Sequence, residues 1–155
     1  MQLILELNNQ TKSPIKKDFF AKVAKKTLEE SGYNFLKKKT ISVSLAIVPK
    51  KEIKKLNKIY RKKDQVTDVL SFAEYKNIGA IKKAVDKPPK GESGEIFLGE
   101  LILCYDDIKE YAKKRGLALK KEMANVVSHG ILHLVGMKHG KEMFALQKKV
   151  IKNKI

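Results

Sequence analysis

An α+β fold is predicted by the order in which strand-like and helix-like segments follow one another along the chain. Segments with alternating apolar residues are mixed with segments of helical spacing, but the third and fourth predicted strands follow each other with no helix between them. This order favours a mixed four-stranded sheet packed by helices over a doubly wound parallel sheet. A length of 155 residues is that of one domain, and no repeat divides it, so we expect a single domain covering residues 1–155.

The first predicted strand and helix lie in the first 32 residues. Residues 2–8 place leucine at every second position, which is the pattern of a half-buried strand. Ser13 and Pro14 are the residue types favoured at a helix N-cap and at the first helical position, so we expect a helix to begin there. Gly32 marks its end.

The middle of the chain continues the alternation. Residues 40–48 alternate strictly between apolar and polar positions and predict the second strand. A short helix over about 50–61 follows, and residues 69–73 form the third strand. The run 75–95 contains glycines, prolines and many charges, and we expect it to be a long exposed loop or lid.

The last third of the chain is predicted to be one strand followed by three helices. Residues 96–104 form the fourth strand, and Gly116 ends the helix that follows it. The three helices are expected over 105–115, about 119–135 and about 142–153.

The chain carries a formal net charge of +17, from 34 basic and 17 acidic residues. Such a field attracts polyanions, of which nucleic acid is the commonest in a cytoplasm. All basic residues except Arg61 and Arg115 are lysine, and they are spread along the whole chain, so a compositional bias explains part of the charge. The charge makes nucleic-acid binding plausible without establishing it.

Cys104 is the only cysteine, so it cannot form an internal disulfide. It lies in an apolar run, and we expect a packed, reduced core residue in a reducing compartment. No secretory-signal pattern occurs at the N-terminus, and no apolar run reaches the ~18 residues of a membrane span. We therefore expect a cytoplasmic protein without a membrane partner.

All three histidines lie in one stretch, residues 129–139. His129 and His133 are four residues apart, so on a helix both rings leave the same face. Gly136 stands where a helix end favours a residue of positive φ, and a turn there can bring His139 back toward the other two rings. Three imidazoles with a fourth position left to water form a catalytic zinc site, although nickel or cobalt could substitute.

Two other interpretations of the histidines are less favourable. A histidine on an apolar helix is usually a core or surface residue with one hydrogen bond, but two on one buried face are hard to satisfy without a metal. A purely structural zinc normally has four protein ligands, and the only cysteine is distant in the sequence. Glu122 precedes His129 by two helical turns and is more simply a surface carboxylate than a group that orients a ligand.

The spacing H-x-x-x-H-x-x-G-x-x-H is that of the metzincin proteases, with one difference. Position 130 is glycine, where those proteases carry the glutamate that acts as general base. The metal geometry is therefore kept while the proton acceptor of a peptidase is missing.

Three segments together resemble the YbeY family of metal-dependent endoribonucleases. The first is Leu-Asn-Lys-Ile-Tyr-Arg-Lys-Lys-Asp at 56–64, continued by Thr-Asp-Val-Leu-Ser-Phe at 67–72. The second is Leu-Gly-Glu-Leu at 98–101, similar to the family's Leu-Gly-Asp-Ile strand, and the third is the histidine stretch itself. The resemblance covers the chain from the second strand to nearly its end.

The resemblance implies a zinc ion held by His129, His133 and His139, with the family's functional arginine at Arg61. It implies cleavage of single-stranded RNA in 16S ribosomal RNA maturation and ribosome quality control, with the small ribosomal subunit and assembly factors as partners and no role for DNA. We expect Arg61 and His129 to be catalytic. Three departures from the family pattern occur, at Ala73, Glu100 and Lys138, and a cation at Lys138 would weaken metal binding unless it points to solvent or to a phosphate.

Arg61 is informative by residue type, because a chain that uses lysine almost everywhere keeps an arginine here. A guanidinium can clamp phosphate oxygens bidentately, which a lysine cannot. We expect Arg61 and the neighbouring lysines Lys58, Lys62 and Lys63 to face the histidines across a groove that holds RNA backbone. The alternative for Arg61 is a surface ion pair with Asp64 or Asp68.

Three functions remain open on the sequence. The favoured one is a zinc-dependent endoribonuclease acting on ribosomal RNA. The second is a non-catalytic RNA-binding ribosome-assembly factor whose metal is structural. The third is a metalloprotease, which Gly130 and the basic surface disfavour.

Overall fold

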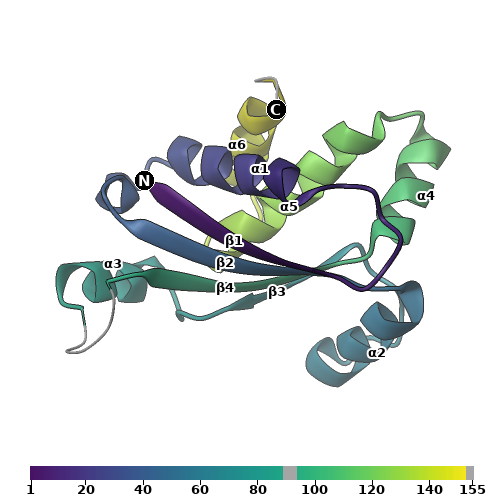
Figure 1. Cartoon of the computed structure of the whole chain (residues 1–155), viewed down its shortest axis with the longest axis horizontal. Helices are drawn as coiled ribbons and strands as arrows, with labels where there is room; N and C mark the ends of the chain where they lie inside the picture. Colours follow the sequence, from purple (N-terminus) through teal and green to yellow (C-terminus); the bar gives the residue numbers. More distant parts are fainter. Residues whose placement is uncertain (89–93, 153–155) are drawn as a thin grey trace.

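A computed structural model describes residues 1–88 and 94–152 of the chain (Figure 1). Four strands and six α-helices alternate along the described part, with one short 3-10 helix, Asn34–Leu36, before the second strand. In chain order they are β1 (Gln2–Asn9), α1 (Lys17–Glu30), β2 (Thr40–Ile47), α2 (Lys50–Arg61), β3 (Val69–Ala73), α3 (Ile78–Asp86), β4 (Ile96–Leu103), α4 (Tyr105–Arg115), α5 (Leu119–Leu134) and α6 (Lys141–Lys152).

The sheet has the strand order β1-β2-β4-β3. β1, β2 and β4 are parallel, while β3 runs antiparallel to β4 at the edge. The connection from β1 to β2 passes through α1, and the connection from β2 to β4 passes through α2, β3 and α3, since parallel neighbours need a crossover. The predicted α+β fold with a mixed four-stranded sheet is confirmed.

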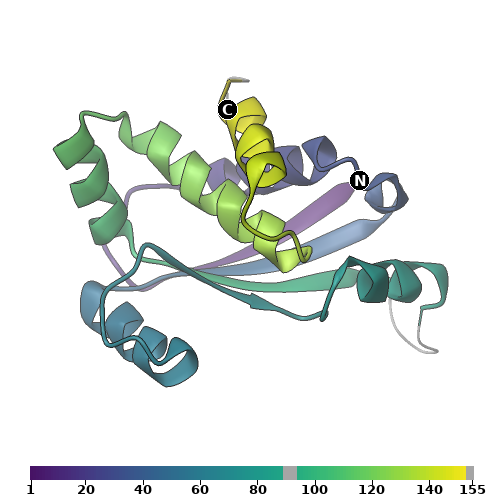
Figure 2. The same cartoon turned by 180° about the vertical axis from the view of Figure 1, so that it is seen from behind.

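One face of the sheet carries the main core. Figures 1 and 2 show α1, α5 and α6 together on this face, with α5 crossing the sheet. Every second residue of β2 is buried there, in agreement with the alternation in the sequence. The largest side chains of this core are fully buried and include Phe20, Leu28, Ile41, Leu45, Leu98, Leu101, Leu103 and Ile108.

The helix α2 packs on the opposite face, over one end of the sheet (Figure 1). Its Ile53 is buried against a second, smaller cluster that includes Leu70 of β3, Ile102 of β4 and Cys104. This contact fixes the C-terminal end of α2, where Arg61 lies, beside the edge strand β3. Cys104 is fully buried with a free thiol, as predicted.

The segment between β3 and β4 contains a helix where we predicted an exposed loop or lid. Asn77 caps α3 by accepting a hydrogen bond from the backbone N–H of Ala80, and Ile81 and Val85 are buried against the core. The prediction of a loop over 75–95 is therefore wrong for Ile78–Asp86. It was also wrong that no helix separates the third and fourth strands. The part of that loop at 89–93 lies outside the described residues.

The start of α1 also differs from the prediction. The helix begins at Lys17, with Lys16 as N-cap, rather than after Ser13 and Pro14. The Ser13 hydroxyl accepts a bond from the backbone N–H of Ile15, and the Ser13 carbonyl accepts one from Asn9. These local bonds hold the segment in a turn that competes with the helix. Among the described residues, no helix is long and apolar enough to cross a membrane.

Candidate metal centre

The helix α5 presents two histidines on its less buried side. Val127, Ile131 and Leu134 are fully buried in the core beneath the helix. His129 and His133, one turn apart, are half-buried and face a pocket instead. The predicted placement of both rings on one helix face is confirmed.

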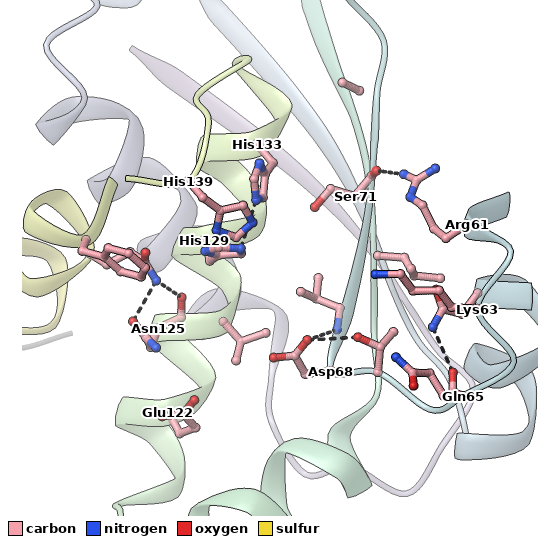
Figure 3. Close-up of a pocket in the computed structure, with 18 residues that line it drawn as sticks. Arg61, Lys63, Gln65, Asp68, Ser71, Glu122, Asn125, His129, His133 and His139 are labelled. Carbon is pink, nitrogen blue, oxygen red and sulfur yellow. Dashed lines mark hydrogen bonds between the residues drawn. The ribbon is translucent and has the colours of Figure 1, made fainter. Parts of the chain in front are cut away.

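A tight turn after α5 brings in the third histidine. Gly136 adopts φ of 86°, and its N–H donates to the carbonyl of His133. A Cβ at this position would lie 3.2 Å from the backbone nitrogen of Ile78, so packing as well as conformation requires glycine. The chain then turns back, and His139 lies beside the other two rings (Figure 3).

The three imidazoles converge closely enough to share one ion. One nitrogen from each ring can be chosen so that all three lie within 4.8 Å of one another, and Nε2 of His129 is 3.0 Å from Nε2 of His133. Two nitrogens bound tetrahedrally to zinc would be about 3.3 Å apart. The donor set therefore fits a borderline metal such as zinc with a position left for water.

The ring of His133 is held in the tautomer that a metal requires. Its Nδ1 lies 3.1 Å from the carbonyl oxygen of Met137, which can only accept, so Nδ1 carries the proton and Nε2 keeps its lone pair. Burial lowers the pKa of His133, and repulsion from His129 and His139 lowers it further. Burial also lowers the pKa of His129. Both rings are thus kept neutral, which is the form that binds metal.

The histidines line a pocket of about 730 Å³ whose other side is formed by α2 and β3. Figure 3 shows the three rings on one side, Arg61 and Lys63 on the other, and Ser71 between them. Of the predicted RNA-contacting residues, Arg61 and Lys63 line this pocket. Lys58 and Lys62 are exposed near the end of α2 but do not line it.

The guanidinium of Arg61 is positioned by backbone and aromatic contacts. It donates to the carbonyl oxygen of Ser71 at 2.7 Å and to that of Tyr60 at 3.4 Å, and it lies 4.9 Å from the centre of the Phe72 ring. The Ser71 hydroxyl in turn contacts the carbonyl of Gly130, next to His129. No ion pair in the described part of the chain involves Arg61, so the alternative pairing with Asp64 or Asp68 is not formed.

Gly130 leaves no room for the glutamate of a metzincin protease. A Cβ there would lie 2.9 Å from Cδ2 of the buried Leu101 and 3.4 Å from the Ser71 hydroxyl. Position 130 therefore faces the sheet, where α5 approaches it closely, and any side chain would be driven into the core. This geometry weighs against a peptidase independently of the missing carboxylate.

Several pocket residues were not predicted as functional. Asn125, Phe144 and Gln147 line the pocket beside the histidines. Asn125 lies one helical turn before His129, so the spacing predicts that both side chains lie on the same face of the helix. Phe144 and Gln147 belong to α6, and no local pattern tells which side of that helix faces the histidines. Lys138 is exposed and does not line the pocket, so its charge is screened by solvent.

Comparisons with known proteins extend the likeness over nearly the whole chain. The family model described as Endoribonuclease YbeY matches residues 6–154. A relative of that name from Bacillus licheniformis is 35% identical over 163 residues, with 97% of this chain and 94% of the relative covered. Another from Bacillus pumilus is 36% identical over 159 residues, with the same two coverages. A relative from Myxococcus xanthus is 36% identical over 116 residues, and the match spans only 36% of that longer protein.

A solved structure agrees with the fold. The solution structure of a protein from Thermotoga maritima matches with a TM-score of 0.57 and 28% identity, covering 96% of this chain and 87% of that one. The residues matched by the family model, 6–154, span all three segments that carry the resemblance in the sequence. The chain therefore belongs to the Endoribonuclease YbeY family.

Proposed function

We propose that this protein is a zinc-dependent endoribonuclease specific for single-stranded RNA, acting in 16S ribosomal RNA maturation and ribosome quality control. One observation carries the proposal: three convergent imidazoles and an arginine held in place by two carbonyls line the same pocket. Membership in a family of endoribonucleases supports RNA cleavage as the reaction.

The metal would be held by His129, His133 and His139, whose rings offer three nitrogens to one point. A bound ion of this kind supplies Lewis acidity and a water of lowered pKa, so the pocket needs no glutamate at position 130. His129 acts in catalysis through this role as a ligand. Zinc is favoured by the donor set, with nickel or cobalt as possible substitutes.

Arg61 would stabilise the charge that develops on the phosphate. The guanidinium has five N–H donors, and two carbonyls fix its orientation while leaving donors for the pocket. The transition state of phosphodiester cleavage carries extra charge on the non-bridging oxygens, and a preorganised guanidinium contacts two of them at once. Lys63 adds a cation on the same wall, where the RNA backbone would pass.

Phe144 supports a preference for single strands. Its side chain is 54% exposed, although it is large and apolar, and it lines the pocket beside the histidines. Unpaired bases can leave the stack and lie on an aromatic ring, which a base within a duplex cannot do. An exposed aromatic ring beside the reactive centre therefore favours an unpaired nucleotide there.

The ribosomal partners and the compartment follow from the proposed reaction. We expect RNA, and 16S ribosomal RNA above all, to bind the basic surface, with the small ribosomal subunit and its assembly factors nearby in the cytoplasm. The net charge of +17 supports an RNA partner. Neither DNA nor a membrane is expected as a partner.

Cleavage of labelled RNA by metal-quantified protein tests the proposal. The substrates are a single strand and its duplex, and the variants are His133→Ala, Arg61→Ala and, as a control on the exposed face of α1, Lys25→Gln. We expect wild type and Lys25→Gln to cut the single strand, His133→Ala to lose metal and activity, and Arg61→Ala to lose activity while keeping its metal. Equal cutting by all four proteins would indicate a contaminant, and the chain would then be a binding factor with a structural metal.

A further inference from the structure

Gln147 is a buried residue whose side chain has only half of its hydrogen bonds accounted for. The residue is 4% exposed, on the side of α6 that packs against α5. Its amide nitrogen donates to the Asn125 side-chain oxygen at 2.9 Å and to the Asn125 carbonyl at 3.3 Å. Its Oε1 is buried and has no hydrogen-bond partner among the described residues.

The orientation of the Gln147 amide is determined by its partners. Both atoms of Asn125 that it contacts are oxygens that accept, so the atom facing them must be the NH₂ group. Exchanging the amide nitrogen and oxygen would place two oxygens against each other. The free carbonyl oxygen is therefore on the side of the amide away from Asn125, where it is buried. The Gln147 residue lines the same pocket as the histidines.

His129 is the group that can use this oxygen. Asn125 and His129 are four residues apart on α5, so the anchor of Gln147 lies one helical turn from the His129 ring. The Gln147 side chain raises the pKa of His129 against the effect of burial, as an acceptor beside a ring N–H does. The Nε2 of His129 faces Nε2 of His133, so Nδ1 is the nitrogen left for Gln147, and it carries the proton when Nε2 binds a metal.

The anchor itself is connected to a carboxylate. Glu122 precedes Asn125 by one turn of α5, and the Asn125 side chain lowers the pKa of this carboxyl group against the effect of burial, as a donor does. With Nδ1–H of His129 directed at Gln147 Oε1, the donors would run in one direction, from His129 to Gln147, from the Gln147 amide to Asn125 Oδ1, and from the Asn125 amide to Glu122. Figure 3 shows Glu122, Asn125 and His129 in sequence along α5, with the two bonds that reach Asn125.

We propose that Gln147 is a positioning residue for His129. Its carbonyl oxygen accepts Nδ1–H, and this bond fixes the tautomer in which Nε2 is free for a metal. The Gln147 side chain also links the ring through Asn125 to the Glu122 carboxylate. Histidine ligands in metal sites commonly donate their second N–H to a carboxylate or carbonyl, and loss of that partner weakens metal binding. Met137 supplies the carbonyl for His133 from the backbone. Gln147 supplies the corresponding group for His129 from a different helix.

The proposal rests on the proposed metal site but not on nuclease activity, so its test reads metal affinity. Gln147→Met keeps the length of the side chain and removes the acceptor. Lys148→Gln, on the exposed side of the same helix, is the matched control. Zinc affinity is measured by competition with a chromophoric chelator, after circular dichroism has shown that each metal-free variant is folded.

We expect Gln147→Met to bind zinc about 10- to 100-fold more weakly, with Lys148→Gln within a fewfold of wild type. The Nδ1–H signal of the His129 ring in the zinc-loaded protein should be shifted downfield and slow to exchange with solvent in wild type, and it should exchange faster in Gln147→Met. Unchanged affinity and unchanged ring signals in a folded Gln147→Met protein would overturn the proposal.

A second variant covers the case in which Gln147→Met fails to fold. Asn125→Ala removes the side-chain anchor while leaving Gln147 in place, and we expect a smaller loss of zinc affinity with the same faster exchange of the His129 Nδ1–H. If Asn125→Ala leaves both unchanged, Gln147 only packs α6 against α5. If both readouts change while wild type fails to cut RNA, the positioning role stands and the proposed nuclease function does not.

Discussion

Phe144 places an apolar ring where the histidines meet solvent, and it serves as a test of how the pocket contacts a base. Stacking of a base on an aromatic side chain contributes about 1–3 kcal/mol. We expect Phe144→Ala to raise KM for single-stranded RNA about tenfold with little change in kcat, and Phe144→Tyr to remain near wild type. Steady-state cleavage of a short labelled strand measures both constants.

Tyr111 provides the control for Phe144, because it is similarly exposed at 47% but does not line the histidine pocket. We expect Tyr111→Ala to leave KM unchanged. An equal rise in KM for both variants would mean that Phe144 acts through general surface binding rather than through a base beside the histidines.

The half-buried His129 and His133 make the stability of the metal-free protein depend on pH. Burial lowers the pKa of His129 and His133 below the ordinary value of 6.5, so below that pH the unfolded chain binds more protons than the folded one. The free energy of unfolding is therefore highest above pH 6.5 and falls as the pH decreases through the window beneath it. Urea denaturation of the chelator-treated protein at pH 7.5 and pH 5.5 measures this loss.

A double variant isolates the histidine contribution to that loss. The raised pKa values of Asp107 and Glu122, caused mainly by burial, act with the opposite sign and are present in both proteins. We expect His129→Gln/His133→Gln to lose less stability than wild type between the two pH values. The histidine explanation fails if the two proteins lose the same amount.

At the level of single residues, the sequence predicted that the three histidines group together, but it did not predict which residues hold the site in place. His129, His133 and His139 could be grouped because helix periodicity and a glycine turn are local properties. The ion-pair alternative for Arg61 could be stated but not decided, since its real partners are backbone carbonyls. Gln147 could not be found, because its role depends on how α6 packs against α5.

The helix α5 approaches the sheet at Gly130, and this close contact predicts a sharp sensitivity to substitution. We expect Gly130→Ala to lower the free energy of unfolding by about 1–3 kcal/mol, because the added methyl group would overlap the buried Leu101 side chain and overpacking has this cost. The higher helix propensity of alanine offsets part of the cost. Thermal or urea denaturation of the two proteins measures the difference.

Gly140 is a suitable control, since a Cβ there would meet nothing within 4 Å. We expect Gly140→Ala to change the free energy of unfolding by less than about 0.5 kcal/mol, as ordinary surface substitutions do. Equal destabilisation by both variants would contradict the close approach of α5 to the sheet.

Elements with strong local patterns were predicted within a residue or two, and weakly marked ones were not. β2 alternates strictly and α5 has a long apolar face, so both were found. The helix α3 was missed because Gly79 and the surrounding charges suggested a loop, although Asn77 as N-cap and the spacing of Ile78, Ile81 and Val85 indicate a helix. The start of α1 was misplaced because Ser13 bonds within a turn instead of capping the helix.

For the whole molecule, the net charge of +17 predicts RNA binding that weakens steeply with salt. Each cation that contacts a phosphate adds about 0.7 to the slope of log affinity against log salt for a single strand. Lys63 lines the pocket, so we expect Lys63→Gln to reduce the slope by about that amount. Filter binding of a non-cleaved RNA analogue over a series of salt concentrations measures it.

Lys25 on α1 is exposed but lies outside the pocket, so Lys25→Gln is the matched control and should leave the slope nearly unchanged. Identical slopes for the two variants would mean that RNA binds the surface without a defined path. In that case RNA affinity would depend on the net charge of the protein and not on the position of individual lysines.

The architecture as a whole was predicted in class but not in arrangement. The sequence predicted an α+β domain with four strands and an endoribonuclease of the YbeY family, and both predictions are confirmed. The strand order, with β4 between β2 and β3, could not be predicted because pairing depends on contacts between residues far apart in the chain. That order places β3 at the edge of the sheet, where α2 and α5 lie on opposite sides of the pocket.

The three histidines lie on both sides of the junction between α5 and α6, and this affects the resistance of the protein to proteases. His129 and His133 belong to α5, while His139 stands just before α6, so an ion held by all three would tie α6 down. Chelation should let α6 detach and offer Met143 and Leu146 to proteases, seen as faster trypsin cleavage near Lys141 than in the zinc-loaded protein. The supply of metal would then determine how fast the protein is degraded and how much of it a metal-starved cell contains.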